Sequence, residues 1–515
     1  MLFNSVEFVF GFFPVTVLVF FAVARRSQPA AAAWLAAASL FFYGWWNWIY
    51  VPLLAASAAF NYLCGVRLAH FVREHRSRAA GALFAFAVGA DLLLLGYYKY
   101  ANFFLDIWAS AAGQASTAAQ IVLPLGISFF TFTQIAFLAD VRRGYAREYS
   151  PIHYGLFVTY FPHLIAGPIL HHKEMMPQFQ ERRTYRANAE DFAVGLTIFV
   201  IGLFKKTVIA DGVGPYAATL FLHGERPDLL AAWGGALAYT FQLYFDFSGY
   251  SDMAIGLSRV FGVKLPLNFD SPYKAVNIVD FWRRWHMTLS RFLRDYLYIP
   301  LGGSRKGPLR RYVNLFVTML LGGLWHGAGW TFVLWGGLHG AYLIINHAWT
   351  ALRRRLGADP DRSAPLGRAA ARAITFLAVV VAWVLFRATS VEDALAILRG
   401  MAGLNGVSLP ASLAPHLGPL RGALEQWGLA FHLGGGTRFV LQYLWIAVLL
   451  PVVLFAPNTQ EILGRFQPSL NFQEHDANGR LAWRPTARWA AITAVVTVCG
   501  LLSLTRVSEF LYYQF

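Results

Sequence analysis

The strongest candidate for chemistry in this sequence is a histidine in the middle of an apolar stretch. His326 lies within GGLWHGAGW, where a membrane span is expected, and an ionisable residue inside a span is costly and often functional. Desolvation favours the neutral imidazole, which can accept a proton and act as a general base toward a hydroxyl group. A histidine packed between helices, with the surrounding glycines at the interface, explains the pattern equally well.

A second histidine, His286, lies 40 residues earlier in FWRRWHMTLS. Two polar rings that flank one membrane helix could face a common cavity, with one as the base and the other as its orienting partner. Taken alone, His286 is better explained as an interfacial residue, because the tryptophans beside it are typical of the headgroup region.

Polar residues around His286 could bind an anionic acyl donor. The guanidinium fork of arginine matches phosphate oxygens, so a coenzyme A thioester is the natural ligand for such a cluster. For any single arginine, the excess of basic residues in cytoplasmic loops is the simpler explanation, and Asp295 lies at helical spacing from Arg291 as a candidate ion-pair partner. The candidates for donor binding or for the lining of a tunnel are Trp282, Arg283, Arg284, Trp285, Arg291, Arg294 and Asp295.

Two further aspartates and the C-terminus complete the polar candidates. Asp246 and Asp252 lie in FDFSGYSD, at the expected end of a span, where they could line a polar tunnel or cap the following helix. The chain ends in SEFLYYQF, which is unusually aromatic for a terminus. An aromatic belt at the membrane interface would explain it. Alternatively, the terminal peptide inserts into a pocket and presents a tyrosine hydroxyl as acyl acceptor.

Metal chemistry has weaker support. His171 and His172 are adjacent and would not face one another on a helix, whereas His339 and His347 are eight residues apart, which suits packing as well as ligation. None of the patterns HExxH, CxxC or GxSxG occurs in the sequence. We therefore expect no metal site.

The elements that position these residues must be built for lipid. Of the 515 residues, 57% are hydrophobic and only 14% are charged, against about 25% charged in a soluble domain. This composition excludes a soluble enzyme, a disordered chain and a secreted disulfide scaffold. The formal net charge of +16 lies in short runs between apolar stretches, as in the loops of membrane proteins, and does not indicate nucleic-acid binding. Cys64 and Cys499 lie far apart in apolar sequence and are expected to be buried.

Apolar windows of about 20 residues predict an all-α polytopic membrane protein, because a helix satisfies its own backbone hydrogen bonds in lipid. Prolines at positions 124, 162 and 168 predict that some segments are re-entrant or half-spanning. The chain 1–515 is expected to form one integral membrane domain. The expected spans are 5–24, 31–49, 51–69, 80–98, 119–139, 152–170, 190–210, 231–247, 312–328, 330–349, 373–389, 438–456 and 487–506.

Loop charge predicts the orientation of the chain. Basic loops follow the third and fifth spans and fill 353–372, so we assign them to the cytoplasm and the more acidic 391–436 to the outside. Both termini, including the tail 508–515, then lie outside. The stretch 264–311 carries ten Lys or Arg and three Asp among aromatic residues, which makes it too polar to span and predicts an ordered functional segment.

Three long stretches closely resemble the membrane-bound O-acyltransferase superfamily, and the nearest likeness is to its bacterial alginate O-acetyltransferase branch. They are YFDFSGYSDMAIGLSRVFGV, LNFDSPYKAVNIVDFWRRWHMTLSRFLRDYLYIPLGGS and GGLWHGAGWTFVLWGGLHG. The core likeness covers residues 241–347, and the length and hydropathy of the rest fit. The resemblance implies a helical bundle pierced by a transmembrane tunnel, in the inner membrane of a bacterium.

The resemblance also implies roles for particular residues. His326 matches the invariant histidine of the superfamily, and His286 matches its second polar position. Tyr512 matches a tail tyrosine proposed as an acyl relay, and Tyr513 stands where phenylalanine is commoner. Acetyl-coenzyme A would be the cytoplasmic acyl donor, without a resident cofactor. A periplasmic transferase of the SGNH-hydrolase kind would place the acyl group on a polysaccharide.

We therefore predict an O-acyltransferase that moves acetyl from acetyl-coenzyme A across the inner membrane for O-acetylation of alginate or a similar exopolysaccharide. Peptidoglycan and cellulose remain alternative acceptors. A polytopic transporter without acyl-transfer chemistry, in which His326 and the aspartates form a proton relay, is the main rival. A metalloprotein built on the four histidines named above is a weaker one.

Overall fold

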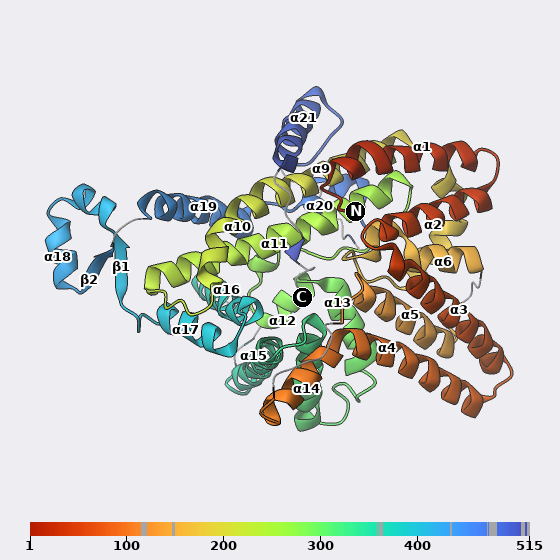
Figure 1. Ribbon diagram of the computed structural model, residues 1–515, viewed down its shortest axis with the longest axis horizontal. Coiled ribbons are helices and arrows are strands. Elements are labelled where there is room, and N and C mark those ends of the chain that lie inside the picture. Colours follow the sequence, from red (N-terminus) through yellow and green to blue (C-terminus); the bar gives the residue numbers. More distant parts are fainter. Residues whose placement is uncertain are drawn as a thin grey trace.

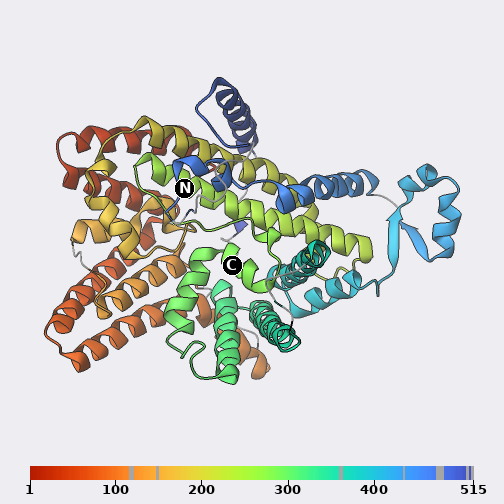
Figure 2. The same cartoon turned by 180° about the vertical axis from the view of Figure 1, so that it is seen from behind.

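Helices form nearly all of the computed structural model, and they surround one long central helix, α11 (Leu229–Val260), in Figures 1 and 2. The prediction of an all-α polytopic bundle is confirmed, with one departure. Strands β1 (Val407–Pro410) and β2 (Leu429–His432) pair in parallel within the stretch 391–436. The residues that the structure describes are 1–114, 121–146, 150–357, 359, 364–432, 435–470, 472, 481–505 and 510–511.

Within the described residues, six helical stretches are long and apolar enough to cross a membrane. Between 17% and 50% of the most apolar window of each is buried in the protein, so the remainder faces outward and suits contact with lipid. The six are Glu7–Ala24 (η1 Glu7–Phe12 and α1 Phe13–Ala24), Trp48–Arg73 (η2 Trp48–Tyr50 and α3 Val51–Arg73), α4 Ser77–Ala111, Ala189–Phe221 (α9 Ala189–Phe204, η4 Lys205–Ala210, α10 Asp211–Ala218 and η5 Thr219–Phe221), α16 Pro365–Arg387 and α19 Gly436–Phe455.

The other predicted spans are shorter, more polar or broken. Helix α2 (Gln28–Gly44) has 17 residues, and α5 (Ile127–Arg142) is buried along almost its whole length. The predicted span 152–170 is interrupted after Thr159, so that α6 (Pro151–Thr159) is followed by the single turn α7 (Phe161–Leu164). This break lies where Pro162 predicted one, because a proline has no N–H to donate to the carbonyl four residues earlier and is tolerated only in the first turn of a helix, so a new helix starts at Phe161.

The central helix α11 is longer than the predicted span 231–247 and is buried almost throughout. It approaches α9 closely at two pairs of glycines. A Cβ atom on Gly256 would lie 2.5 Å from the Gly195 carbonyl oxygen, and one on Gly249 would lie 2.8 Å from that of Gly202. Small residues therefore let the two backbones touch, as in many membrane helix pairs.

The polar stretch 264–311 is ordered, as its aromatic content predicted. It forms the short helices η6 (Pro272–Lys274), α12 (Ile278–Arg284), α13 (Met287–Leu293) and η7 (Arg294–Tyr298). The chain then enters a hairpin of α14 (Pro308–His326) and α15 (Trp330–Arg355). The short helices thus lie between the central helix and the hairpin.

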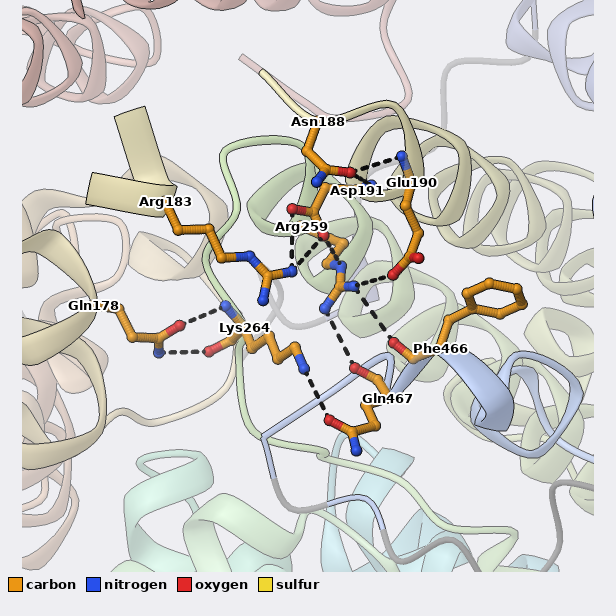
Figure 3. Close-up of polar contacts among 9 residues, drawn as sticks. All are labelled: Gln178, Arg183, Asn188, Glu190, Asp191, Arg259, Lys264, Phe466 and Gln467. Atoms are coloured by element: carbon orange, nitrogen blue, oxygen red, sulfur yellow. Dashed lines mark hydrogen bonds and ion pairs between the residues drawn. The ribbon is translucent and has the colours of Figure 1, made fainter. Parts of the chain in front are cut away.

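A network of ion pairs and hydrogen bonds holds the end of α11, where the polar stretch begins (Figure 3). Buried Arg259 pairs with Asp191 of α9 at 2.7 Å, and Arg183 of η3 (Arg182–Tyr185) pairs with the same carboxylate at 3.1 Å. Gln178 of α8 (His172–Gln180) exchanges two hydrogen bonds with the backbone of Lys264, at 2.8 and 3.0 Å. The network therefore joins the end of α11 to the segment 178–191, which is distant from it in sequence.

Two parts project from the bundle in Figure 1. One contains the sheet, η8 (Ala411–Leu417) and α18 (Leu420–Gln426), and it follows α17 (Val391–Met401). The other is α21 (Ala487–Leu502), which is followed by η11 (Ser503–Thr505); α20 (Thr459–Ile462) and η9 (Gly464–Phe466) precede it. Cys499 lies on α21 and is exposed, so the prediction of a buried side chain is wrong for it, whereas Cys64 is buried.

Candidate active site

The structure brings His286 and His326 together. His326 is the last residue of α14, and His286 precedes the first residue of α13 with a left-handed φ of 43°. Both side chains are buried, and their ring centroids lie 6.4 Å apart. A non-glycine residue in the left-handed region stores strain that the surrounding structure must offset, which is common at functional sites.

Asn268 holds the ring of His286 in one tautomer. The Asn268 Oδ1 accepts hydrogen bonds from Thr288 Oγ1 (2.9 Å) and from the Thr288 backbone N–H (3.4 Å), which identifies it as the amide oxygen. It lies 3.0 Å from His286 Nδ1, so Nδ1 must carry the proton as donor. The Nε2 atom is then the nitrogen with the lone pair.

Aromatic side chains enclose the ring of His326. The ring centroids of Trp335 and Phe386 lie 5.2 and 5.1 Å away, both edge to face. The cavity beside the ring, which Trp285 also lines, has a volume of about 10 Å³. This is close to the space of one water molecule, so this cavity can hold an acyl group only if its aromatic wall moves.

A larger pocket of about 530 Å³ lies beside the histidine pair, between α12, α13, η7 and the α14–α15 hairpin. Four of the predicted donor-binding residues line it, namely Trp282, Arg283, Arg291 and Arg294. Met319 also lines it and precedes His326 by seven residues on α14, which is about 10 Å along a helix. Thr288 links its wall to Asn268 and hence to His286.

The arginines of this pocket differ in their charge partners. Arg291 makes a two-pronged ion pair with Glu174, at 2.5 and 2.8 Å, so the predicted Arg291–Asp295 pair is wrong. Asp295 instead pairs with its neighbour Arg294 at 2.7 Å. Arg283 makes no ion pair with any residue that the structure describes, which leaves its charge available to a ligand.

Five other predicted residues lie outside the lining of this pocket, namely Asp246, Asp252, Arg284, Trp285 and Asp295. Arg284 pairs with Asp280 at 2.8 Å and with Asp270 at 3.4 Å. Trp285 stacks on Phe281 and forms part of the aromatic wall beside His326.

Asp252 lies within α11, eight residues before its end, where it accepts hydrogen bonds from Lys205 (2.7 Å), Thr459 (2.6 Å) and Gln460 (3.2 Å). These partners tie α11 to η4 and α20. The expectation that FDFSGYSD ends a span is wrong, because α11 continues unbroken through Asp252 to Val260.

Asp246 connects the C-terminal segment to the core. Its carboxylate pairs with Lys206 at 2.7 Å and accepts a hydrogen bond of 3.2 Å from the Leu511 backbone N–H. Phe510 is buried and stacks on Tyr250, with ring centroids 4.6 Å apart. The expected insertion of the terminal peptide is therefore observed for residues 510–511; Tyr512 and Tyr513 lie outside the described residues.

The inserted segment reaches the histidine pair through a single ring. Phe247 lies 5.7 Å from Phe510 and 4.9 Å from His286, both measured between ring centroids. The tail thus reaches His286 through Phe247, and the large pocket reaches it through Thr288 and Asn268.

The four histidines considered above for metal binding, His171, His172, His339 and His347, do not form a metal centre. His171 bonds to Tyr296 at 2.9 Å, His172 faces Asp140 at 3.4 Å, and His339 accepts from Trp282 Nε1–H at 3.2 Å. Within the described part of the chain, no group of three or more His, Cys, Asp or Glu side chains could hold a metal ion.

Asn268 and Lys99 are site residues that the sequence did not reveal. Lys99 donates to the carbonyl oxygens of Trp325 and His326, the latter at 3.2 Å, and Tyr100 donates to that of Leu324 at 2.9 Å. The last carbonyls of a helix have no partner within it, so α4 caps the end of α14 that carries His326. The signal available in the sequence was a lysine inside an apolar stretch.

Comparison with known proteins agrees with this arrangement. The chain is 45% identical over 440 residues to the peptidoglycan O-acetyltransferase of Helicobacter pylori, which covers 79% of this chain and 81% of that protein. It is 44% identical over 401 residues to the "Probable alginate O-acetylase AlgI" of Pseudomonas aeruginosa, covering 76% and 73%. It is 38% identical to the protein of the same name from Azotobacter vinelandii, over the full length of both.

A family model describes the region that contains both histidines and the large pocket, whereas the tail and Lys99 lie outside it. It matches residues 105–386, more than half of the chain, and its description is the membrane-bound O-acyltransferase family. The match includes the polar stretch, both histidines and the α14–α15 hairpin. Together with the full-length likeness above, it shows that the chain is an acyltransferase and belongs to the membrane-bound O-acyltransferase family.

Proposed function

We propose that this protein is an O-acetyltransferase that takes acetyl from cytoplasmic acetyl-coenzyme A and passes it to an acceptor on the periplasmic side of the inner membrane. The observation that carries the proposal is the meeting of three parts at one place. Two buried histidines lie between a pocket lined by arginine and a C-terminal segment that ends near the predicted relay tyrosine. The names of the relatives support acetyl as the transferred group.

The large pocket is the site that we assign to the donor. Its volume of about 530 Å³ suits a drug-sized group, and its lining combines apolar side chains with Arg283, Arg291 and Arg294. Arg283 would bind a phosphate group of coenzyme A, because guanidinium matches phosphate geometry and this one has no competing carboxylate among the described residues. Arg291, already paired with Glu174, would contribute less.

In the proposed reaction, His326 removes the proton from the hydroxyl group of Tyr512. The phenolate oxygen attacks the thioester carbonyl carbon, and the C–O bond forms. Collapse of the tetrahedral intermediate breaks the C–S bond, and the leaving thiolate takes the proton from His326. The products are acetyl-tyrosine and free coenzyme A, and the base is regenerated. His286, fixed by Asn268, would orient His326 or the thioester carbonyl.

The acetyl group would then leave on the outer side. A periplasmic partner of the SGNH-hydrolase kind would take it from the tyrosine and place it on a polysaccharide. Alginate or a similar exopolysaccharide is the acceptor that we favour, and peptidoglycan is the alternative that the Helicobacter relative supports. Loop charge supports the orientation, with both termini in the periplasm and the polar stretch 264–311 in the cytoplasm.

Mass spectrometry of the C-terminal peptide tests the proposal. The purified protein is incubated with acetyl-coenzyme A, alone and with the periplasmic partner, in parallel with a His326→Ala variant. One acetyl group on Tyr512 or Tyr513 is expected in the wild-type protein and none in the variant. Tyr512→Phe and Tyr513→Phe variants identify the acceptor hydroxyl.

The same experiment separates the alternatives. Release of coenzyme A without an acetylated tyrosine would support the acyltransferase activity but contradict the tyrosine relay. A transporter would release no coenzyme A under any condition, and that outcome would overturn the proposal.

A further inference from the structure

A pocket of about 430 Å³ lies between α15 and α16, against the start of α12. Near one end of this α15–α16 pocket the two helices are joined, because Tyr342 donates a hydrogen bond of 3.2 Å to the Ala378 carbonyl oxygen (Figure 1). None of its lining residues also lines the donor pocket. On α12, Ile278 lines this pocket and the next residue, Val279, lines the donor pocket. The short helix α12 therefore separates two distinct sites.

The lining of the α15–α16 pocket changes from charged to apolar along the two helices. At its charged end are Arg353, in the last turn of α15, and Arg368, in the first turn of α16. Trp349 lies one helical turn from Arg353, and Ile345 and Ile374 lie further along. Charge, then an aromatic ring, then aliphatic side chains is the order in which a membrane changes from its surface to its interior.

The length and the exposure of this pocket suit one half of a bilayer. Tyr342 and Arg353 both line it and are 11 residues apart on α15, which is about 16 Å along a helix. One leaflet of the hydrocarbon core is about 15 Å thick. Ile345, Trp349 and Ile374 are each more than half exposed, so the apolar part of the pocket is open at the surface of the bundle. A lipid molecule can therefore enter it from the side.

The charged end of the pocket has a surplus of positive charge. The arginines at this end of the two helices are Arg353, Arg354, Arg355, Arg368 and Arg372. Arg353 donates a hydrogen bond of 3.0 Å to the Asp359 carbonyl oxygen, and the side chain of Arg368 forms no ion pair or hydrogen bond with any residue that the structure describes. The excess of basic residues in cytoplasmic loops explains the number of arginines. It does not require that arginines from two helices line one pocket whose other end is apolar.

We propose that the α15–α16 pocket binds one anionic phospholipid, with its phosphodiester at Arg353 and Arg368 and an acyl chain along Ile345 and Ile374. Guanidinium groups match phosphate oxygens, and a tryptophan such as Trp349 suits the level of the lipid headgroups. Loop charge assigns this end of both helices to the cytoplasm, so the lipid would belong to the inner leaflet, and basic pockets between membrane helices on that side suit acidic headgroups. A soluble phosphate would satisfy the arginines but leave the apolar end unused. The proposal goes beyond the proposed function and does not depend on it.

Native mass spectrometry of the full-length protein tests this inference. The protein is purified in a mild detergent and mixed with equal amounts of phosphatidylglycerol and phosphatidylcholine that carry the same acyl chains. One phosphatidylglycerol per protein is expected to remain bound, with a preference of roughly tenfold over the zwitterionic lipid. An excess of inorganic phosphate or of acetyl-coenzyme A should not displace it.

Two double variants that lose the same charge locate the site. Arg353→Gln combined with Arg368→Gln should reduce the preference for phosphatidylglycerol about tenfold, because both arginines that line the pocket are removed. Arg354→Gln combined with Arg355→Gln is the matched control. These two side chains are exposed at the same helix end but do not line the pocket, so the preference should be retained.

A second pair of variants tests the apolar part of the site. Ala371→Trp places a large side chain in the pocket without changing the charge and should reduce the retention of phosphatidylglycerol. Ala370→Trp, at the exposed neighbouring position that does not line the pocket, should leave it unchanged. Equal retention in the two tryptophan variants would contradict the place assigned to the acyl chain.

Other outcomes would overturn the inference. Equal retention of the two lipids by the wild-type protein would show that no acidic headgroup is selected. An equal loss in the two double arginine variants would assign the preference to the general charge of the loop. Displacement by inorganic phosphate would identify a site for soluble anions, and displacement by acetyl-coenzyme A would identify an extension of the donor site.

Discussion

The hydrogen bond from His286 to Asn268 determines which nitrogen of the ring carries the proton. Because the amide oxygen is held by Thr288 from the opposite side, the ring cannot exchange tautomers without breaking this group of contacts. An ordinary interfacial histidine would need no such support. The left-handed backbone at His286 also indicates that neighbouring contacts hold this residue in place, since such strain persists only where the surrounding structure enforces it.

Substitution of Asn268 should therefore reduce turnover without removing the donor site. We expect Asn268→Ala to lower kcat roughly tenfold, the effect of losing one orienting hydrogen bond, while KM for acetyl-coenzyme A changes little. Steady-state kinetics of coenzyme A release measures both constants. Asn277→Ala, which removes a helix cap beside the donor pocket, is the control for a loss of local structure. An unchanged kcat in a folded Asn268→Ala variant would contradict the orienting role.

At this scale the sequence indicates the ionisable residues but not what holds them. His326 stands out because it is polar within apolar sequence and lies in a long family motif. Asn268 is 18 residues from His286, and Lys99 is 227 residues from His326, so no local spacing relates them. Such pairs exist only once the helices have packed. The tail tyrosines are predicted from the motif alone.

At the scale of elements, the backbones of α9 and α11 lie in close contact, and glycines on both helices make this contact possible. A Cβ atom on Gly256 would meet the Gly195 carbonyl oxygen and the Phe199 backbone nitrogen, both at 2.5 Å. Neither neighbour can rotate away, because both are backbone atoms. The position of α11 fixes Asp246 and Phe247, so this contact also supports the seat of the tail.

Gly256→Ala should therefore destabilise the protein by about 1–3 kcal/mol, the usual cost of overpacking. A lower Tm in detergent is expected, together with weaker acetyl transfer. Gly89→Ala on α4 is the matched control, because a Cβ atom there meets nothing within 4 Å, and its Tm should be unchanged or slightly higher. Equal melting temperatures for the two variants would show that the helices can separate without cost.

The loop after η5 is attached to α17 through a pH-dependent pair. His223 Nδ1 lies 3.0 Å from the Asp393 carboxylate, which also accepts from Thr389, Ser390 and the Gly224 N–H. The hydrogen bond with Asp393 raises the pKa of His223, and the hydrogen bond with His223 lowers the pKa of Asp393. Glu392 is the other charge near the imidazole and also raises its pKa.

Attachment of this loop should be strongest in mildly acidic solution. The contribution of His223 is fully present below its ordinary pKa of about 6.5 and is lost as the pH rises through the raised value; that of Asp393 is present above about 3.9 and is lost as the pH falls through the lowered value. Hydrogen exchange at Gly224, corrected for the intrinsic rate, should show about twofold less protection at high pH than near pH 5.5, because the imidazole is exposed. His223→Ala should remove this dependence, and a persisting dependence would assign it to another group.

The sequence predicts helix boundaries well where a proline or the thickness of the membrane determines them. It predicts them poorly where ion pairs between distant residues determine them. The break before Phe161 follows from Pro162. The end of α11 was predicted 13 residues too early, because Asp246 and Asp252 suggest the close of a span. Lysines from η4, 40 and 47 positions away in sequence, neutralise both carboxylates inside the bundle, and no pattern within the helix announces them.

At the scale of the whole molecule, the large pocket and the inserted C-terminal segment both reach His286, the pocket through Thr288 and Asn268 and the segment through Phe247. In the proposed reaction the acetyl group would pass from the pocket to this segment and so toward the periplasm. This arrangement depends on the orientation that loop charge predicts.

Cysteine labelling tests that orientation. In a chain with Cys64→Ala and Cys499→Ala, Leu420→Cys on α18 should react with a membrane-impermeant maleimide in spheroplasts, because 391–436 is assigned to the periplasm. Arg305→Cys, in the polar stretch, should react only after the membrane is permeabilised. The reverse pattern would place the donor pocket outside and contradict the proposed direction of transfer.

The buried Phe510 also bears on how often the C-terminal segment occupies its binding site in the core. The segment that carries it is tethered to α21, whose last residue is Leu502, so a detached tail stays within a few nanometres of its seat. Such a short tether gives an effective concentration of the order of millimolar, which no freely diffusing peptide would reach in a cell. In the proposed reaction a tail that left its seat would therefore return promptly, and the enzyme would carry its own first acceptor.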